Sequence, residues 1–303
     1  MELPTTGHDP VLLDPVLQYL LPKDDLPLTL VDCTVGRGGH AEALAKAAQA
    51  GSQVIGLDYD PRNLEYAQAR LQHLPVRLFH ANFSEIDDAL EAAGVEQVDG
   101  ILADLGISTN QLFDAAYGLS FTNDVPLDMR LDPRQNLSAR TIVNSWPEQK
   151  IADLLFQMAD ERFSRRIARK IVEARKQTPI NSTEHLAELV RSVVPPTRGR
   201  DRTKEIDRAT RTFLALRMAV NGEMQNLERL LKVAPALLKP GGRLAIITFH
   251  STEDRLVKQT FRSAEQTGQL KVLTSKPITP DDDEIARNPR SRSAKMRIVE
   301  KRA

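Results

Sequence analysis

One short stretch constrains the fold of this chain more than any other. Residues 30–32 form an apolar run that ends in an acid, a glycine-rich turn follows at residues 36–39, and residues 41–48 are strong helix formers. A strand, a tight glycine turn and a helix present backbone N–H groups to a ligand at the helix N-terminus of an α/β sheet. The stretch therefore predicts the first βα unit of such a sheet, although glycine spacing alone leaves an ordinary βα turn open.

Two further apolar runs, residues 54–58 and 98–104, also end in an acid. The first of these acids, Asp58, lies 22 residues after Gly36. This spacing is close to the gap of about 20 residues to the acid that binds a ribose hydroxyl in nucleotide-binding βαβ units. Because ligands of open parallel sheets bind at the carboxyl ends of the strands, we expect the three strand-end acids to face one nucleoside-containing cofactor.

The acids and the glycine pattern also predict which cofactor binds. Carboxylates from Asp32, Asp58 and Asp104 at one edge would repel phosphate groups, but they suit a ligand with hydroxyls, an amino group and a positive charge. This favours S-adenosylmethionine, whose sulfonium is cationic, over NAD. The turn also departs from the dinucleotide pattern G-x-G-x-x-G, because residue 41 is alanine. An NAD-linked oxidoreductase stays as the alternative, which a measurement of NAD binding would test.

Length and composition fit a globular protein of one large domain or two. The chain has 303 residues, of which 41% are hydrophobic and 27% charged. We find no apolar run of the roughly 20 residues that a membrane span needs, and no pattern of a signal peptide. Cys33 is the only cysteine, so we expect no internal disulfide, no metal site and a cytoplasmic location; the sequence leaves the oligomeric state open.

Charge is balanced overall but clustered along the chain. The 41 basic and 41 acidic residues cancel, so the net charge alone predicts no nucleic-acid partner. Basic residues nevertheless concentrate in residues 162–176, 198–211 and 287–302. Such patches can track a phosphate backbone, and they can equally be solvated surfaces. The short acidic run at residues 281–284 is predicted to be a solvated loop.

The alternation of strands and helices stops in the middle of the chain. Residues 150–176 and 183–194 have helical patterns with no strand between them. We therefore predict an inserted helical domain at residues 113–211 that recognises the substrate, between two parts of an α/β core at residues 1–112 and 212–303.

Strands resume in the last third of the chain. A long helix predicted at residues 209–231 precedes a strand at residues 243–249. Ser251 with Asp254 has the pattern of a capping box that opens the next helix. This places His250 at a strand-to-helix turn on the edge where the ligand is expected.

Several separate segments, in order along nearly the whole chain, resemble the bacterial 16S ribosomal RNA (cytosine-N4)-methyltransferase family. The departures are modest, with Thr109, Asn110 and Thr252 where the family commonly has serine, proline and leucine. The matching segments are His8-x-Pro10-Val11-Leu12-Leu13, Asp32-x-Thr34-x-Gly36-Arg37-Gly38-Gly39-His40, Asp104-Leu105-Gly106-Ile107-Ser108, Pro126-Leu127-Asp128-Met129-Arg130, Phe249-His250-Ser251-x-Glu253-Asp254-Arg255 and Asn288-Pro289-Arg290-Ser291-Arg292-Ser293.

The resemblance implies a class I methyltransferase sheet, mostly parallel and Rossmann-like, with a helical insert. It implies S-adenosylmethionine as cofactor, and as substrate the N4 amine of a decoding-centre cytidine in the 16S ribosomal RNA of the small ribosomal subunit. Carried over by position, Asp58 would bind the ribose hydroxyls and Phe83 would flank the adenine, although Phe83 could also be a core residue. The implied cofactor-binding residues are Gly36, Gly38, Gly39, His40, Asp58, Phe83, Asp104 and Gln111.

The chemistry of a cytosine amine suggests what the catalytic residues must do. Its lone pair is delocalised into the ring, so transfer needs N4 held in line with the methyl group and an acceptor for an amino hydrogen. Asp104 is the predicted acceptor, and His250 is the second catalytic candidate. Methylation at carbon 5 would need a cysteine nucleophile, whereas Cys33 lies within the first strand.

The base must be splayed out of the folded RNA, and basic residues of the insert and of the tail are expected to bind the phosphates. A non-catalytic RNA-binding or ribosome-assembly protein that keeps the fold is the remaining alternative. The predicted substrate-binding residues are Asp128, Arg130, Ser251, Arg165, Arg166, Arg169, Arg290 and Arg292.

Overall fold

The computed structural model describes residues 10–21, 26–196 and 207–303. The chain divides into two compact units, Met1–Gly106 with Met224–Ala303, and Ile107–Glu223. The second unit therefore begins at residue 107 instead of 113 and ends at residue 223 instead of 211. His8 of the first matching segment and residues 198–206 of the second basic cluster lie outside the described residues.

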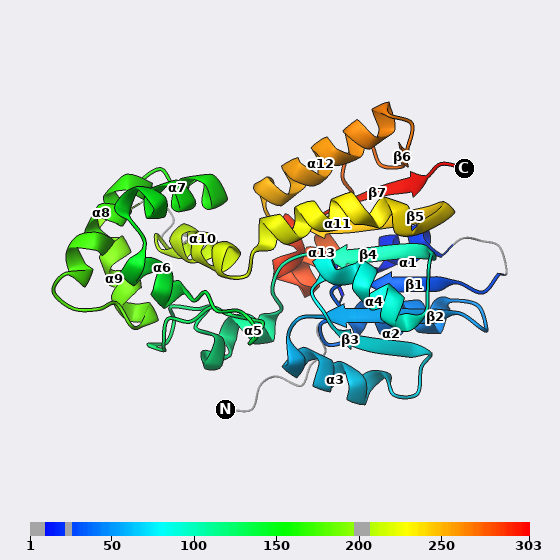
Figure 1. The fold of residues 1–303 in the computed structure, drawn as a ribbon, viewed down its shortest axis with the longest axis horizontal. Helices are drawn as coiled ribbons and strands as arrows, with labels where there is room; N and C mark the ends of the chain where they lie inside the picture. Colours follow the sequence, from blue (N-terminus) through cyan, green and yellow to red (C-terminus); the bar gives the residue numbers. More distant parts are fainter. Residues whose placement is uncertain (1–9, 22–25, 197–206) are drawn as a thin grey trace. The chain divides into compact units, whose positions relative to one another are not determined.

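The first unit is built on a seven-stranded sheet in the order β3-β2-β1-β4-β5-β7-β6 (Figure 1). Strands β1 to β5 pair in parallel, and β7 is antiparallel to both of its neighbours. The strand order reverses at β1, and the crevice at such a point is where open α/β sheets bind their ligands. The strands are β1 Thr29–Asp32, β2 Gln53–Asp58, β3 Val76–His80, β4 Val98–Asp104, β5 Leu238–Thr248, β6 Leu270–Val272 and β7 Lys295–Lys301.

Apolar side chains cover both faces of this sheet, as a buried parallel sheet requires. Val31 and Ile101 belong to one core cluster, to which α4, α11 and α12 contribute. Their neighbours Leu30 and Leu102 belong to a second cluster with α1, α2 and α3. The helices of this unit are α1 Leu13–Leu20, α2 Gly39–Ala47, α3 Pro61–Leu71, α4 Ile86–Ala93, α11 Glu223–Leu237, α12 Ser251–Gln266 and α13 Asp282–Arg287, with 3-10 turns Phe83–Glu85 and Pro289–Ser293.

The second unit is helical. The segment predicted as one helix at residues 150–176 is two, because Asp160 takes a left-handed φ of 50° and ends the first of them. Across the described residues, we find no helix with the length and apolar character of a membrane span. The helices of this unit are α5 Thr109–Phe113, α6 Ala139–Ser145, α7 Glu148–Ala159, α8 Ser164–Arg175, α9 Thr183–Val193 and α10 Thr210–Val220, with a 3-10 turn at Ala115–Tyr117.

The single long helix predicted at residues 209–231 is wrong, because the chain breaks between α10 and α11. Gly222 takes a left-handed φ of 61° at the break. The Asn221 side chain accepts a hydrogen bond from the Leu131 N–H at 3.0 Å and donates one to the Met129 carbonyl at 2.9 Å. The amide of Asn221 therefore holds a distant loop of the second unit, which explains why the helix stops here.

The predicted capping box of α12 is also wrong by one residue. His250 is the N-cap, and its partner in the box is Glu253. Asp254 instead receives a hydrogen bond from the Arg297 guanidinium of β7 at 2.7 Å. Since the ion pair with β7 uses the carboxylate of Asp254, the box forms around the preceding acid.

The acidic run at residues 281–284 is the beginning of α13 and not a loop. Asp281 is the N-cap and accepts a hydrogen bond from the Glu284 N–H at 2.7 Å. The Glu284 carboxylate accepts a hydrogen bond from the Leu12 N–H at 2.8 Å. The run thus connects the segment before α1 to the C-terminal part of the same unit.

Candidate active site

The carboxyl edge of the sheet collects the strand-end acids, as the sequence predicts. Asp32, Asp58 and Asp104 are the last residues of β1, β2 and β4, and β1 pairs with both other strands. Burial raises the pKa of Asp32 and of Asp58 to about 7. Burial, together with the nearby Asp32 carboxylate, holds the pKa of Asp104 well above its ordinary value.

The glycine turn follows β1 and needs glycine for two separate reasons. Gly36 and Gly38 take left-handed φ values of 52° and 87°. A Cβ on Gly39, at the start of α2, would lie 3.1 Å from the ring of Pro10. The turn is therefore tight both in its backbone angles and in its approach to the segment before α1.

Asp58 is held against this turn by three hydrogen bonds. Its Oδ2 accepts from the Gly36 N–H at 2.8 Å and from the Asn63 amide at 3.3 Å, and its Oδ1 accepts from the Asp60 N–H at 2.8 Å. A carboxylate has about four acceptor positions, so Oδ1 can still accept a hydroxyl donor. Asn63 was not predicted from the sequence, because its role depends on α3 turning back over the strand end.

Thr34 joins the ends of β1 and β4. Its hydroxyl oxygen accepts a hydrogen bond from the Asp104 N–H at 2.7 Å, and its own N–H donates to Asp32 Oδ1 at 3.1 Å. Asp32 Oδ2 and Asp104 Oδ1 are buried and make no hydrogen bond with the described residues. Sequence reasoning placed Thr34 in a motif without giving it a role.

His40 lies beside Asp104 in the first turn of α2. The ring is 6% exposed, with Nε2 2.9 Å from the Val11 carbonyl oxygen and Nδ1 3.8 Å from Asp104 Oδ2. The structure therefore turns this ring toward the predicted proton acceptor, and a direct part in cofactor binding stays a prediction for His40.

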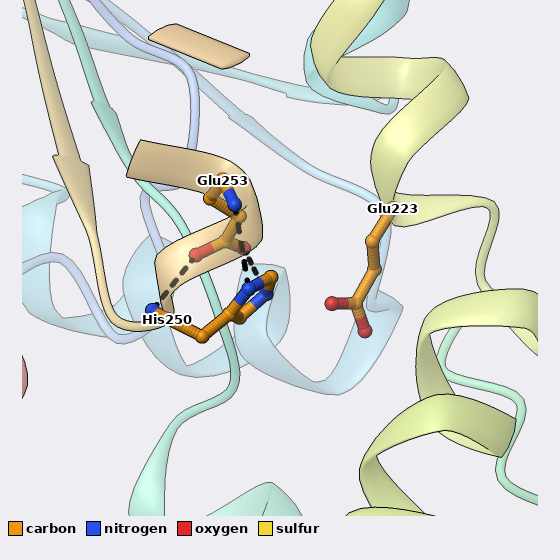
Figure 2. Close-up of side chains that lie close together, drawn as sticks. All are labelled: Glu223, His250 and Glu253. Atoms are coloured by element: carbon orange, nitrogen blue, oxygen red, sulfur yellow. Dashed lines mark hydrogen bonds and ion pairs between the residues drawn. The ribbon is translucent and has the colours of Figure 1, made fainter. Parts of the chain in front are cut away.

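Figure 2 shows His250 and Glu253 at the start of α12. His250 Nδ1 accepts a hydrogen bond from the Glu253 N–H at 3.4 Å, and Nε2 lies 3.0 Å from Glu253 Oε1. Glu253 also accepts from the Phe249 N–H at 3.1 Å and is only 3% exposed. Both ring nitrogens of His250 face its own helix turn, which gives the residue a structural role; its catalytic role stays a prediction.

Two predicted cofactor residues have local structural partners. Phe83 is buried within the core cluster of α4, α11 and α12. Gln111 belongs to the second unit, where its Oε1 accepts a hydrogen bond from the Ser108 N–H at 3.0 Å and closes the capping box of α5. Contact with the cofactor stays a prediction for both.

The predicted substrate residues of the second unit fall into two groups. Arg130 donates to both oxygens of Asp128, at 2.7 and 2.8 Å, and to the Gln135 carbonyl at 3.0 Å. Neighbouring Arg130 holds the pKa of Asp128 below its ordinary value. Arg165, Arg166 and Arg169 are exposed on α8, where Arg169 lies 3.7 Å from Glu148.

The other predicted substrate residues belong to the first unit. Ser251 is exposed in the first turn of α12, and Arg292 is exposed in the 3-10 turn that precedes β7. Arg290 of the same turn is partly buried, and this burial lowers the pKa of its guanidinium. Binding of RNA by these residues stays a prediction.

The residues at the carboxyl edge fit S-adenosylmethionine. The unpaired buried oxygens of Asp32 and Asp104 can accept from an amino group, and the negative charges of Glu253 and Glu284 near Asp104 suit a cationic sulfur. Asp58 can accept from a ribose hydroxyl, whereas a phosphate would meet like charge. The sheet order and this edge together define an S-adenosylmethionine-dependent methyltransferase with the class I fold.

Comparison with known proteins gives the family. The chain belongs to the MraW methylase family, whose sequence profile matches residues 5–302. It is 44% identical to the ribosomal RNA small subunit methyltransferase H of Syntrophobacter fumaroxidans, over 98% of this chain and 97% of that protein. The proteins of the same name from Thermosipho melanesiensis and Solibacter usitatus are 45% and 47% identical, over 97% and 90% of this chain and 97% and 92% of their own lengths.

One solved structure that this chain resembles is more distant in sequence. A putative rRNA-methylase from Clostridium thermocellum superimposes with a TM-score of 0.45 at 12% identity, over 95% of this chain and 94% of that chain.

Replacing Asp58 should weaken cofactor binding. We expect Asp58→Asn to raise the dissociation constant for S-adenosylmethionine by about 10- to 100-fold, because a hydrogen bond to a charged group contributes roughly 1.5–3 kcal/mol. Isothermal titration calorimetry measures this directly. Asp87→Asn is the matched control, since Asp87 pairs with Arg229 on the same unit. Equal affinities of the two variants would contradict the assignment of Asp58 to the ribose.

Burial of Asp32 should make the cofactor-free protein less stable as the pH rises. The pKa of Asp32 is about 7 in the folded chain, whereas an aspartate in the unfolded chain has its ordinary pKa of 3.8. The folded state therefore binds the proton more tightly. Tighter proton binding by Asp32 stabilises the folded state. This contribution to the free energy of unfolding is fully present below about pH 4 and is lost as the pH rises through about 7. Between pH 5 and pH 8 we expect wild type to lose about 2–3 kcal/mol relative to Asp32→Asn.

Hydrogen exchange of the Cys33 N–H, which donates to the Leu102 carbonyl at 2.8 Å, reports the opening of β1 without interference from the second unit. The comparison is between wild type, Asp32→Asn and the control Asp87→Asn at both pH values. Parallel pH dependences of wild type and Asp32→Asn would show that Asp32 does not titrate as expected.

Proposed function

We propose that this protein methylates the exocyclic N4 amine of a cytidine in the 16S ribosomal RNA of the small ribosomal subunit, in the cytoplasm. Relatives named for methylation of ribosomal RNA of the small subunit align with nearly the whole chain. The observation that carries the proposal is Asp104, an acid at the cofactor edge whose buried Oδ1 has no hydrogen-bond partner among the described residues.

Asp104 can act as the acceptor that N4 methylation needs. When bound, S-adenosylmethionine supplies a methyl group on a positively charged sulfur. The carboxylate of Asp104 then accepts the hydrogen that N4 loses, and a carboxyl with a raised pKa is a stronger base for this step than an ordinary one. Asp104 is 21% exposed, so a substrate can reach it, while Asp32 behind it is fully buried.

The state of Cys33 argues against the alternative methylation at carbon 5. The thiol is buried, and burial and the neighbouring Asp32 raise its pKa well above the ordinary value. A protonated, inaccessible thiol cannot act as the nucleophile that carbon-5 methylation requires. The chain therefore favours transfer to an amine.

The exposed arginines of α8 supply the phosphate contacts in this proposal. Arg165, Arg166 and Arg169 project from one helix, and Arg166 lies over the Phe163 ring at 5.6 Å. Guanidinium groups bind phosphate in two-point contacts, which suits an RNA whose target base must be splayed out of its fold.

Nucleoside mass spectrometry of 16S ribosomal RNA tests the reaction in cells. In a strain that lacks the protein, we expect N4-methylcytidine to fall and to return with wild type or Asp87→Asn but not with Asp104→Asn. Loss of an acceptor in general acid–base catalysis costs about 10²- to 10⁴-fold in rate, enough to remove the signal. An unchanged nucleoside profile in the deletion strain would refute the proposed reaction, and retained RNA binding would then point to a non-catalytic binding protein.

Replacing the three arginines of α8 tests their part in RNA binding. The variant with Gln at 165, 166 and 169 should bind the RNA more weakly and with a shallower salt dependence. For single-stranded RNA, the log–log slope should fall by about 0.7 for each phosphate that the variant no longer neutralises. Fluorescence anisotropy across a salt series measures both quantities. The variant with Lys at the same positions keeps the charge and should keep most of the slope. If the Gln variant matches wild type in affinity and slope, α8 does not bind the phosphates.

A further inference from the structure

We infer that the Trp146 ring is a stacking platform for an unpaired base of the substrate RNA, beside the basic helix α8. The inference rests on the proposed function in one respect, namely that the ligand is a single-stranded stretch of RNA. It adds contact with a base to the phosphate contacts that the arginines of α8 supply. All of the residues that carry it belong to the second unit.

Trp146 occupies a well-defined position between two helices. It is the C-cap of α6, where its N–H donates to the Ile142 carbonyl at 3.1 Å, and Pro147 follows as the N-cap of α7. The backbone of Trp146 is extended, as is usual for a residue before proline. The side chain therefore projects from a short connection that is held at both ends, so less conformational entropy is lost when a ligand binds to it.

Lys150 covers one face of the Trp146 ring. The lysine ammonium lies 3.6 Å from the ring centroid. Lys150 is exposed and Trp146 is half-buried, so solvent reaches the side chain that lies over this face of the indole. Among aromatic rings, the indole of tryptophan attracts cations most strongly. The ring face thus already holds a positively charged group in the free protein.

A nucleobase can replace this lysine on the ring. A cation–π contact at an exposed site favours the bound arrangement by about 2- to 5-fold, whereas stacking of a base on an aromatic side chain contributes about 5- to 150-fold to affinity. The stronger interaction displaces the Lys150 ammonium from the ring face. The ammonium then binds the phosphate of the same strand, so the lysine contributes to affinity in its second position as well.

Helix α8 lies next to the connection that carries Trp146. Helix α7 packs against α8, and α6 also contacts it (Figure 1). The Arg175 guanidinium of α8 donates to the Val143 carbonyl at 2.8 Å, shortly before Trp146 in the chain. Shortly after Trp146, Glu148 lies 3.7 Å from Arg169 of α8. The connection is therefore in contact with the basic helix on both sides of the tryptophan.

The charges near the ring favour an anionic strand. The Glu148 carboxylate faces Arg169, but the two side chains are 44% and 69% exposed, and an exposed ion pair of this kind is weak. Arg169 can therefore exchange this partner for a phosphate. An aromatic ring among cations is the combination with which proteins bind single-stranded RNA. An acidic protein partner would use the cations but would not need the ring, which favours RNA as the occupant.

The test is direct because Trp146 is the only tryptophan of the chain. Fluorescence of the full-length protein, excited beyond the absorption of tyrosine, is titrated with single-stranded oligoadenylate. The control is an abasic strand of the same length, which has the phosphates but no bases. We expect oligoadenylate to quench the emission, because a stacked base quenches an indole, and the abasic strand to leave it nearly unchanged. Equal changes with both strands would overturn the inference, and so would unchanged emission while anisotropy shows that labelled oligoadenylate is bound.

Substitution of the ring tests its contribution to affinity. Trp146→Ala should weaken binding of oligoadenylate by about 5- to 150-fold and leave binding of the abasic strand within about twofold of wild type. Trp146→Phe keeps a stacking ring and should lose less. Phe156→Ala is the matched control, because it removes another exposed aromatic ring from α7. An equal loss in Phe156→Ala, or an equal loss for the abasic strand, would contradict the inference. The wild-type titration decides even if Trp146→Ala does not fold.

Lys150→Gln separates the lysine from the ring. We expect oligoadenylate still to quench the emission of this variant, because the ring is intact. The log–log salt slope of binding should fall by about 0.7, because one phosphate is no longer neutralised. Loss of the quenching in Lys150→Gln would show that the base does not take the place of the ammonium on the ring.

The inference and the proposed function can fail separately. If wild type forms N4-methylcytidine but shows no base-dependent quenching, the platform is refuted and the reaction stands. If wild type forms no N4-methylcytidine but shows base-dependent quenching and a loss of affinity in Trp146→Ala, the reaction is refuted, and the platform belongs to an RNA-binding protein.

Discussion

The hydrogen bond from the Asp104 N–H to the Thr34 hydroxyl joins β4 to the loop after β1, just beyond the last paired residues of these two strands. The paired register of β1 and β4 ends at Asp32 and Leu102, because the chain beyond β1 turns into the glycine loop. The N–H of Asp104 would then have no partner on that side, and a buried N–H without a partner is costly. The Thr34 hydroxyl supplies the missing acceptor at 2.7 Å, and the Thr34 N–H donates to Asp32 Oδ1. Thr34 therefore connects the glycine loop to both acids.

The buried acids at this edge of the sheet lower the stability of the first unit as long as no ligand is bound. Asp32 and Asp58 are nearly or fully buried, and no lysine or arginine forms an ion pair with either of them among the described residues. Burial of a carboxylate without a cation disfavours its charge, which is the cause of the raised pKa values. A ligand that brings a positive charge and hydrogen-bond donors relieves this cost, so binding and stability of the first unit are coupled.

The parts of the site that could be predicted from the sequence are those that depend on the order of apolar and acidic residues within one short segment. Apolar runs that end in an acid located Asp58 and Asp104 at strand ends. The rest depends on contacts between segments far apart in the chain. His40 meets Asp104 across 64 positions, and the break at Asn221 is set by a loop about 90 residues earlier. The box at His250 was missed because serine with a following acid is the commoner pattern, and an ion pair with β7 overrides it.

The burial of Cys33 has a practical consequence for work on this protein. Its thiol is 1% exposed and stays protonated near neutral pH, because burial and Asp32 raise its pKa. Thiol reagents attack the thiolate, so the native cysteine is protected from them in the folded chain. A cysteine introduced at an exposed position, such as Tyr66 of the first unit or Phe156 of the second, would therefore be the sole reactive thiol. Either unit can then carry a spectroscopic label while the strand that holds Asp32 keeps its natural sequence.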